Sequence, residues 1–252
     1  MIFALFGHGR FGRAFADLLC RAGHELRVFD PQADVPAELV RATPAETLEG
    51  AEWVVLAMPV PQLEPALREL RPLLASQQTV IDVGSVKQHP CELLDRHLGD
   101  AIAHAGTHPL FGPLSIARGE PLRTVLCASA RHPQAAERTR ALFESLGCAV
   151  IAQDAAAHDR AMAKTHALAF FIARALVEMG VGDDLSMAPP SFLGLANMLA
   201  AVRGDAGHLF AAIQRENPYA EGARAELLEH LDAIHRRLLA SDEALAIPPP
   251  SR

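Results

Sequence analysis

The segment GHGRFG at residues 7–12 matches the pattern G-x-G-x-x-G and joins an apolar run at 2–6 to an amphipathic stretch at 10–22. Between a strand and a helix, such glycines permit a tight turn, close approach of a ligand to the backbone, and close helix–strand packing. The helix N-terminus also attracts a pyrophosphate through its free N–H groups and its dipole. The segment therefore predicts a dinucleotide-binding turn, with an ordinary βα turn as the alternative. The predicted cofactor contacts are Gly7, His8, Gly9, Arg10, Phe11 and Gly12.

Asp30 is predicted to select the cofactor. It ends the second apolar run, LRVFD, and follows the last glycine at close to the spacing of about 20 residues at which an acidic residue binds the ribose. A carboxylate there accepts hydrogen bonds from both ribose hydroxyls and repels a 2′-phosphate. Because no arginine occurs at 31–40 to neutralise such a phosphate, the pattern favours NAD over NADP. The alternative is a turn cap before Pro31.

Short β-like runs alternate with helical stretches up to residue 153. The runs are continuously apolar, which is typical of strands buried on both faces of a parallel sheet. The alternation predicts an α/β fold that begins with a Rossmann-type doubly wound sheet. The expected strands cover 2–6, 26–30, 53–58, 79–84, 102–106, 124–129 and 149–153, and the expected helices lie near 10–22, 61–74, 88–98 and 133–146.

Strand patterns stop after residue 153, and the rest of the chain is rich in helix formers. We therefore expect an NAD-binding Rossmann-type domain at 1–153 and an all-helical substrate and dimerisation domain at 154–252. The helix expected at 155–180 ends at Gly180 and is apolar nearly all round, which indicates burial on most sides. So small a domain cannot cover it alone, so we expect a homodimer formed through this domain. Further helices are expected at 191–203, 205–216 and 220–241.

The amino-acid composition and net charge limit the classes of partner that the protein is expected to bind. The net charge is −7, half of the residues are hydrophobic and 21% are charged, which is ordinary for a globular protein and argues against nucleic acid or an anionic membrane as the main partner. The four cysteines form no CxxC pair, and Cys20 and Cys127 lie in apolar runs, so we expect reduced core thiols, no metal site and a cytoplasmic protein. The first residues lack the features of a signal peptide, and we expect no membrane span.

Three strand ends carry residues suited to chemistry, since ligands of such sheets bind beyond the carboxyl ends of the strands. MPVPQ at 58–62 makes a rigid loop, in which Pro59 is expected near the cofactor; a simple strand stop is the alternative. DVGSVKQ at 82–88 places a hydroxyl and an ammonium after the next strand. In THPLFGP at 107–113, the first proline restricts the preceding histidine to extended backbone geometry. The second proline stiffens the far side, so the prolines are expected to aim the imidazole.

The motifs DVGSVK and HPLFGP together resemble those of the prephenate and arogenate dehydrogenases of tyrosine biosynthesis. The resemblance extends over nearly the whole chain, including GHGRFG and AHDRAMAKTHAL at 157–168. It implies NAD-dependent oxidation of a cyclohexadienyl substrate by hydride transfer with loss of CO2, driven by aromatisation. Prephenate would give 4-hydroxyphenylpyruvate, and arogenate would give tyrosine. With no regulatory extension in the sequence, we expect a bare catalytic unit.

The resemblance assigns roles to four residues. His108 would accept the proton of the substrate's C4 hydroxyl, a task suited to a neutral imidazole because its pKa lies near working pH. Ser85 would hydrogen-bond this histidine or the substrate hydroxyl, beside the cofactor. Lys87 would hold the anionic substrate or organise the cofactor side, with a solvated surface lysine as the alternative. His166 would face the substrate, with a core or interface role as the alternative.

The chain departs from the family pattern at one position. An arginine that binds a substrate carboxylate usually follows the break before the next helix, whereas Leu193 occupies the matching position here. Arg203 is the predicted substitute, with Arg118 or Arg123 as alternatives. The loss weakens the choice of substrate, and nothing in the sequence distinguishes prephenate from arogenate.

Two rival functions stay open. A β-hydroxyacid or imine reductase of the same two-domain plan would use a lysine on the long helix with an asparagine four residues later. Lys164 fits the first requirement, but residue 168 is leucine. A non-catalytic NAD-binding module is the other rival, and the missing arginine is its only support.

The pair His158-Asp159 is expected at the start of the long helix, where the negative charge of the aspartate interacts favourably with the helix dipole.

Overall fold

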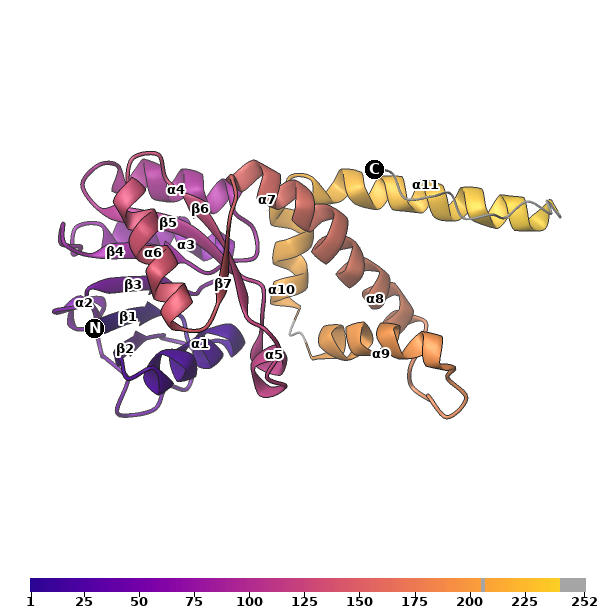
Figure 1. Cartoon of the computed structure of the whole chain (residues 1–252), viewed down its shortest axis with the longest axis horizontal. Helices are drawn as coiled ribbons and strands as arrows, with labels where there is room; N and C mark the ends of the chain where they lie inside the picture. Colours follow the sequence, from indigo (N-terminus) through magenta and orange to yellow (C-terminus); the bar gives the residue numbers. More distant parts are fainter. Residues whose placement is uncertain (205–206, 241–252) are drawn as a thin grey trace.

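The computed structural model describes residues 1–204 and 207–240. A seven-stranded sheet in the order β2-β1-β3-β4-β5-β6-β7 forms its first half, as Figure 1 shows. This arrangement confirms the predicted Rossmann-type fold followed by a helical region. The strands are β1 Ile2–Phe6, β2 Glu25–Phe29, β3 Trp53–Leu56, β4 Thr79–Asp82, β5 Ala103–Pro109, β6 Arg123–Ala128 and β7 Ala149–Ala152.

Helices cover both faces of the sheet because successive strand residues point to opposite sides. On one side, Phe3 packs in a cluster with Phe15 of α1 (Arg10–Arg21) and Phe143 of α6 (Pro133–Ser145). On the other side, Ala4 packs in a cluster that contains residues of α3 (Val60–Leu70) and α4 (Gln88–Leu98). Because both faces of the sheet are buried, the strands must be apolar at successive positions. The positions of the strands were therefore predictable from apolar runs in the sequence.

One strand runs against the predicted direction. The pairs from β2 to β5 are parallel, and so is β6 with β7, but β6 is antiparallel to β5. The connection at 110–122 contains only the short helix α5 (Pro113–Ala117) and returns at the same edge of the sheet instead of crossing it. This helix and α2 (Pro44–Leu48) were not predicted.

The helical half begins where β7 ends. The helix expected at 155–180 is formed by α7 (Ala155–Met162), the π-helical segment η1 (Ala163–Ala167) and α8 (Leu168–Glu178), and Gly180 follows with a φ of 77°. The expected helix at 205–216 begins outside the described residues, and its described part is α10 (His208–Ala211) with η2 (Ala212–Glu216). The other helices are α9 (Pro190–Arg203) and α11 (Ala220–Leu239). The predicted end of the last helix at 241 also lies outside the described residues.

Figure 1 shows how the helical half meets the sheet. α7 lies close to α4, α8 runs away from the sheet toward α9, and α11 projects as a long arm. None of the helices described here has the length and apolar character needed to cross a bilayer.

The four cysteines are free thiols. Cys127 and Cys148 are buried, but Cys20 is exposed, which corrects its predicted place in the core.

The fold brings the predicted strand-end residues to one edge. Strands β1 to β5 are mutually parallel, so their carboxyl ends share an edge of the sheet. The glycine-rich turn, Asp30, Pro59 and Ser85 follow β1, β2, β3 and β4, and His108 lies at the end of β5.

Candidate functional site

The glycine-rich turn has the shape of a cradle for a dinucleotide. Gly7 has a φ of 100°, and a Cβ there would lie 2.7 Å from the carbonyl oxygen of Ala57. A Cβ on Gly12 would lie 2.3 Å from the carbonyl oxygen of Gly7. Gly9 is the N-cap of α1, has no capping side-chain bond, and has open space where a Cβ would stand. The first N–H groups of α1 are therefore free for an anion, and Pro59 begins the neighbouring loop as the N-cap of α3.

Asp30 supports the turn and remains an acceptor. Its Oδ2 accepts a hydrogen bond from the backbone N–H of His8 at 2.6 Å, and its Oδ1 accepts from Gln32 and Ala33 at 2.9 and 3.0 Å. Burial raises the pKa of Asp30, but these backbone N–H groups outweigh it and hold the pKa below its usual value. The carboxylate therefore caps its own turn, which was the alternative interpretation, and is also placed beside the cradle.

Side chains of the turn connect it to other parts of the molecule. His8 is buried, with its Nδ1 3.2 Å from the carbonyl oxygen of Asp34. The exposed guanidinium of Arg10 donates to the carbonyl of Gly204 at the end of α9. The ring of Phe11 lies 6.0 Å from that of Phe111. The turn thus contacts both the helical half and the loop that follows His108.

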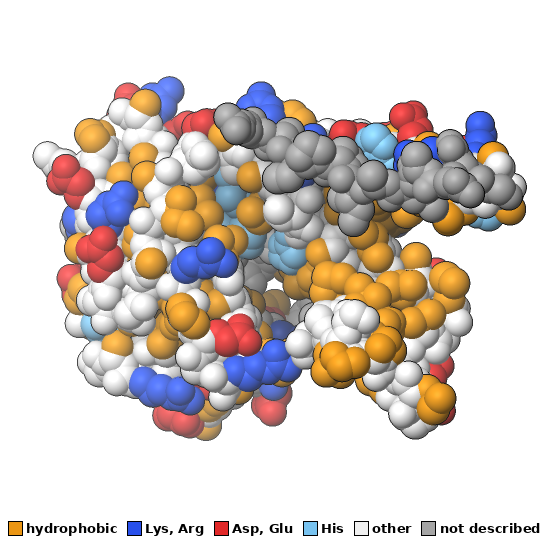
Figure 2. Space-filling view, turned by 45° about the vertical axis from the view of Figure 1, so that its right-hand side comes forward, with side chains coloured by type: hydrophobic (Ala, Val, Ile, Leu, Met, Phe, Trp, Pro, Cys, Tyr) orange, Lys and Arg blue, Asp and Glu red, His pale blue; other side chains and the backbone are white. Residues whose placement is uncertain are grey.

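His108 belongs to a cluster of three histidines at the end of β5. It is buried, and its Nδ1 lies 2.8 Å from Nε2 of His158 on α7. The ring of His166, on η1, stacks nearly parallel to that of His108 with centroids 6.1 Å apart. Figure 2 shows histidine side chains, in pale blue, gathered where the sheet half and the helical half meet above a hollow. The structure therefore brings together the two histidines predicted for the site and adds His158.

Asp159 anchors this cluster. Its Oδ1 lies 2.8 Å from Nδ1 of His158, and its carboxylate accepts hydrogen bonds from the backbone N–H groups of Lys87 and Gln88, both at 2.8 Å. Asn217 donates to the Asp159 backbone carbonyl at 2.8 Å. The sequence interpretation placed His158 and Asp159 at the start of the long helix and did not include them in the site; the adjacent polar pair in AHDRAM was the signal that could have placed them here.

Lys87 occupies a different environment from the predicted one. It is completely buried, its ammonium forms an ion pair with Asp82, and it donates to the carbonyl of Thr107 at 2.6 Å. The alternative of a surface lysine is therefore wrong. The predicted contact with an anionic substrate is not available either, because no part of this side chain is exposed. Lys87 instead holds the loop after β4 against β5.

Ser85 is half-buried in the same loop. Within the described part of the chain it forms no hydrogen bond, so the predicted bond to His108 is not made in this structure. A contact of Ser85 with a substrate hydroxyl or a cofactor stays a prediction.

Burial keeps the two central histidines neutral. Desolvation, followed by electrostatic repulsion from His158, Lys87 and His166 when these groups are protonated, lowers the pKa of His108 well below 6.5. Burial and the nearby His158 lower the pKa of His166 to about 4. At neutral pH both imidazoles are therefore uncharged, which is the state that a proton acceptor needs.

The predicted carboxylate-binding arginine is engaged elsewhere. Arg203 is exposed and forms an ion pair with Asp183. Arg118 lies 3.6 Å from Glu120, and Leu193, at the position of the expected arginine, is 56% exposed. No arginine contact to the histidine cluster occurs among the described residues, so how a substrate carboxylate is held stays a prediction.

Lys164 faces away from the cluster. Its ammonium lies 3.6 Å from Glu226 of α11, and both side chains are exposed. A lysine in this position is not placed to serve the reductase chemistry considered as an alternative.

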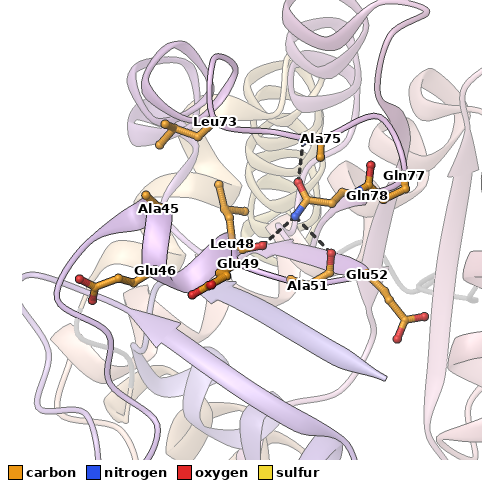
Figure 3. A pocket seen from close by; sticks show the side chains of 11 residues that line it. Ala45, Glu46, Leu48, Glu49, Ala51, Glu52, Leu73, Ala75, Gln77 and Gln78 are labelled. Atoms are coloured by element: carbon orange, nitrogen blue, oxygen red, sulfur yellow. Dashed lines mark hydrogen bonds between the residues drawn. The ribbon is translucent and has the colours of Figure 1, made fainter.

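A surface hollow at the opposite edge of the sheet offers no comparable chemistry. Figure 3 shows its lining residues near the amino ends of β3 and β4. The side-chain amide of Gln78 donates to the carbonyls of Leu48 and Ala51 at 2.9 and 3.2 Å, and accepts from the N–H of Ala75 at 2.9 Å. The central polar group is thus fully used in holding loops together.

Comparison with known proteins points to one family. Residues 29–152 match the model of the prephenate dehydrogenase nucleotide-binding domain. The chain is 23% identical over 181 residues to a probable arogenate/prephenate dehydrogenase of Methanocaldococcus jannaschii, covering 69% of this chain and 40% of that protein. It is 25% identical over 242 residues to the chloroplastic arogenate dehydrogenase 2 of Arabidopsis thaliana, covering 91% of this chain and 66% of that protein. The matches thus span less than two thirds of each relative.

The fold has a counterpart among solved structures. Prephenate dehydrogenase from A. aeolicus, in complex with hydroxyphenyl propionate and NAD+, superposes with a TM-score of 0.75 at 20% identity. The match covers 97% of this chain and 92% of that chain. At this identity the likeness establishes the shared two-part fold.

Proposed function

Since the chain belongs, through residues 29–152, to the prephenate dehydrogenase family, we propose that it is an NAD-dependent dehydrogenase that converts prephenate or arogenate by oxidative decarboxylation. The observation that carries this proposal is the position of His108. A buried, neutral imidazole lies at the same sheet edge as a glycine-rich cradle that suits a dinucleotide.

The residues of the cradle fit NAD. The open N-terminus of α1 would receive the pyrophosphate, and the close contacts of Gly7 and Gly12 leave no room for side chains on that path. Asp30, with its low pKa, would accept from the adenosine ribose hydroxyls. Bound NAD would supply the hydride acceptor. The prediction of NAD over NADP rests on the carboxylate, which repels a 2′-phosphate.

In the proposed reaction, His108 accepts the proton of the substrate's C4 hydroxyl as the C4 hydride departs. Loss of the ring carboxylate as CO2 leaves its bonding electrons in the ring and completes aromatisation to a phenolate, which takes a proton back from His108. His166, stacked near His108, is proposed to face the substrate ring. Ser85 is proposed to meet the hydroxyl or the cofactor, since it lies in the loop at the same edge.

Arg203 remains the proposed partner of a substrate carboxylate. It is adjacent to Gly204, whose carbonyl accepts from Arg10 of the glycine-rich turn, so the end of α9 lies beside the proposed cofactor site. Binding would require Arg203 to exchange Asp183 for the substrate. A charge-assisted, bidentate pair of this kind is a strong and geometrically selective contact.

The two halves of the chain are proposed to have different functions. Residues 1–153 would bind NAD, and residues 154–252 would complete the substrate cleft and form a homodimer. Figure 2 shows hydrophobic side chains gathered over the helical half, and large exposed patches of this kind mark interaction sites. We also propose a cytoplasmic location, in line with the free cysteines.

The test is formation of reduced nicotinamide, followed by its absorbance, with purified protein, NAD, and prephenate or arogenate in parallel. Turnover of either compound is the expected result, and the faster reaction names the substrate. If NAD binds but neither compound is oxidised, the proposal fails. A panel of β-hydroxy acids and cyclic imines then tests the reductase alternative, and inactivity throughout favours a non-catalytic NAD-binding module.

A further inference from the structure

We infer that His158 and Asp159 are positioning residues that fix the tautomer of His108, so that its Nε2 is the proton-accepting atom. The inference rests on the proposed function of His108. It concerns a pair of residues that the proposed reaction does not yet use.

The argument starts from a continuous hydrogen-bonded chain. Asp159 Oδ1 lies 2.8 Å from His158 Nδ1, and His158 Nε2 lies 2.8 Å from His108 Nδ1. All three side chains are buried. The two imidazole planes are inclined by 77°, so they meet edge-on through their nitrogen atoms.

The direction of every bond in this chain follows from Asp159. Backbone N–H groups can only donate, and they donate to both carboxylate oxygens: Lys87 to Oδ1 and Gln88 to Oδ2. Two backbone N–H groups that donate to one carboxyl group favour its ionised form, which only accepts hydrogen bonds. His158 must therefore carry its proton on Nδ1 and donate it to Asp159.

The tautomer of His158 determines the tautomer of His108. In its neutral form, His158 has one N–H and one acceptor nitrogen, so its Nε2 is then the acceptor. His108 must donate to it from Nδ1. The remaining nitrogen of His108, Nε2, is then left with a free lone pair.

That lone pair is open to a ligand. Among the described residues, Nε2 of His108 has no hydrogen-bond partner, and it is not among the enclosed polar atoms that lack one. The chain of bonds thus holds the acceptor nitrogen ready on the accessible side of the ring. With the opposite tautomer, the same atom would carry a proton and could not serve as a base.

Asp159 also provides a balancing charge. Lys87 and His166 face His108 and oppose a positive charge on it, as does burial, whereas Asp82 is engaged by Lys87. When Nε2 takes the substrate's proton, the Nδ1 proton of His108 can pass to Nε2 of His158. His108 is then neutral again, and the positive charge lies on His158, next to the Asp159 carboxylate.

The alternative role for this pair is purely structural, because Asp159 also ties α7 to the loop before α4. Loss of that role would reduce stability, and would weaken NAD binding and turnover together. It would not change which nitrogen of His108 carries the proton. The tautomer is therefore the property to measure.

Imidazole 15N NMR on the ligand-free protein measures it directly, without any substrate. His108→Asn identifies the His108 signals. We expect both His108 and His158 to be Nδ1–H tautomers at neutral pH in the wild-type protein. In Asp159→Asn, the new amide can donate to His158 Nδ1, so both tautomers should invert. A wild-type His108 that carries its proton on Nε2 overturns the inference, whether or not prephenate is oxidised.

Kinetics supply the second test. Asp159→Asn should lower kcat by about 10²-fold or more, in the range of general base catalysis, with NAD affinity and KM within a few-fold. In the pH profile of kcat, the acid limb of Asp159→Asn should lie at lower pH than that of the wild type. Without the negative charge of Asp159, the protonated form of His108 is less stable, so its pKa is lower. His158→Gln keeps an acceptor for His108, so it should lose less activity than His158→Phe.

The control is a second His–Asp pair, in which the histidine is buried and the aspartate is partly exposed. His104, also on β5, is bonded through Nε2 to Asp95 Oδ1 at 2.8 Å. Asp95→Asn should leave the His108 tautomer and the pH profile unchanged. If Asp159→Asn loses NAD affinity and kcat in parallel, with an unshifted pH profile, the pair is structural and the inference is wrong. If the wild type shows the expected tautomers but oxidises neither substrate, only the proposed function fails.

Discussion

At the scale of single residues, Asp30 accepts hydrogen bonds within its own turn and is also the proposed ligand of the cofactor ribose. Three backbone N–H groups hold it in place, so its carboxylate is already ordered before a ribose arrives. Preorganisation of this kind reduces the entropy that binding would otherwise cost.

Asp30→Ser should weaken NAD binding by about 10-fold or more, because a hydrogen bond to a charged group is lost. The single hydroxyl of serine can replace only part of these three backbone hydrogen bonds, so the melting temperature should also fall slightly. Because the negative charge disappears, the ratio of NAD to NADP affinity should fall. Fluorescence titration with both nucleotides measures it, and an unchanged ratio would remove the cofactor argument.

His166 couples stability to pH. Its pKa is about 4 in the folded protein, against an ordinary value of 6.5. As the pH falls from 6.5 toward 4, the unfolded chain takes up this proton and the folded protein does not, so the free energy of unfolding decreases. Above pH 6.5 the contribution is constant. The lowered pKa of His108 likewise decreases the free energy of unfolding as the pH falls.

His166→Gln should therefore lose less stability than the wild type when the pH is lowered from 7 to 4.5. Urea unfolding of both proteins at the two pH values measures the difference, with pH 8 against pH 7 as the control interval. Equal losses in the two proteins would mean that the His166 ring is not kept neutral by the fold.

At the scale of helices and strands, the periodic parts of the fold were the predictable ones. The helix at 88–98 and the strand at 2–6 were predicted with the bounds that the structure gives. Each depends on a local pattern of apolar residues. The direction of β6 was not predictable, because it depends on the path of the chain through 110–122 rather than on the strand's own residues.

The site shows the same division. The glycine-rich turn and His108 carry local signals, in the spacing of the glycines and in the flanking prolines, so sequence reasoning could single them out as candidates. The burial of Lys87 depends on Thr107 of the next strand as well as on Asp82. The bond between His108 and His158 joins residues 50 positions apart. Contacts of this kind leave no periodic pattern in the sequence.

The glycine-rich turn permits a matched pair of substitutions. Gly12→Ala should destabilise the protein, because the new Cβ would lie 2.3 Å from the backbone oxygen of Gly7. Gly9→Ala should leave the melting temperature nearly unchanged, since its φ is −67° and no atom lies within 4 Å. It should still weaken NAD binding by obstructing the approach to the backbone.

Thermal unfolding and NAD titration of the two variants separate the two effects. Equal melting temperatures would show that Gly12 does not pack as closely as described. Wild-type NAD affinity in Gly9→Ala would place the pyrophosphate elsewhere.

At the scale of the whole molecule, α11 presents an apolar stripe that stays exposed in the described part of the chain. Leu228, Leu231, Ile234 and Leu238 recur at intervals of three and four residues and are between 43% and 57% exposed. Residues at these intervals share one face of a helix. A second copy of the chain is the proposed partner for this face.

Replacing Leu231 and Ile234 together by lysine should shift the protein from dimer to monomer in sedimentation analysis. Glu229→Lys, which adds a lysine to the same helix at an already polar position, is the control and should stay dimeric. A wild-type protein that sediments at the chain mass of 27.0 kDa would contradict the proposed homodimer.

The central claim is that His108 performs the proton step beside a bound NAD. The most direct measurement compares the wild type with His108→Asn, recording the rate of reduced nicotinamide formation and the NAD dissociation constant on the same preparations. The account predicts that kcat falls by about 10²- to 10⁴-fold, the usual contribution of a general base, while NAD affinity stays within a few-fold. A parallel loss of both would make His108 a structural residue, and undiminished turnover would place the proton acceptor elsewhere.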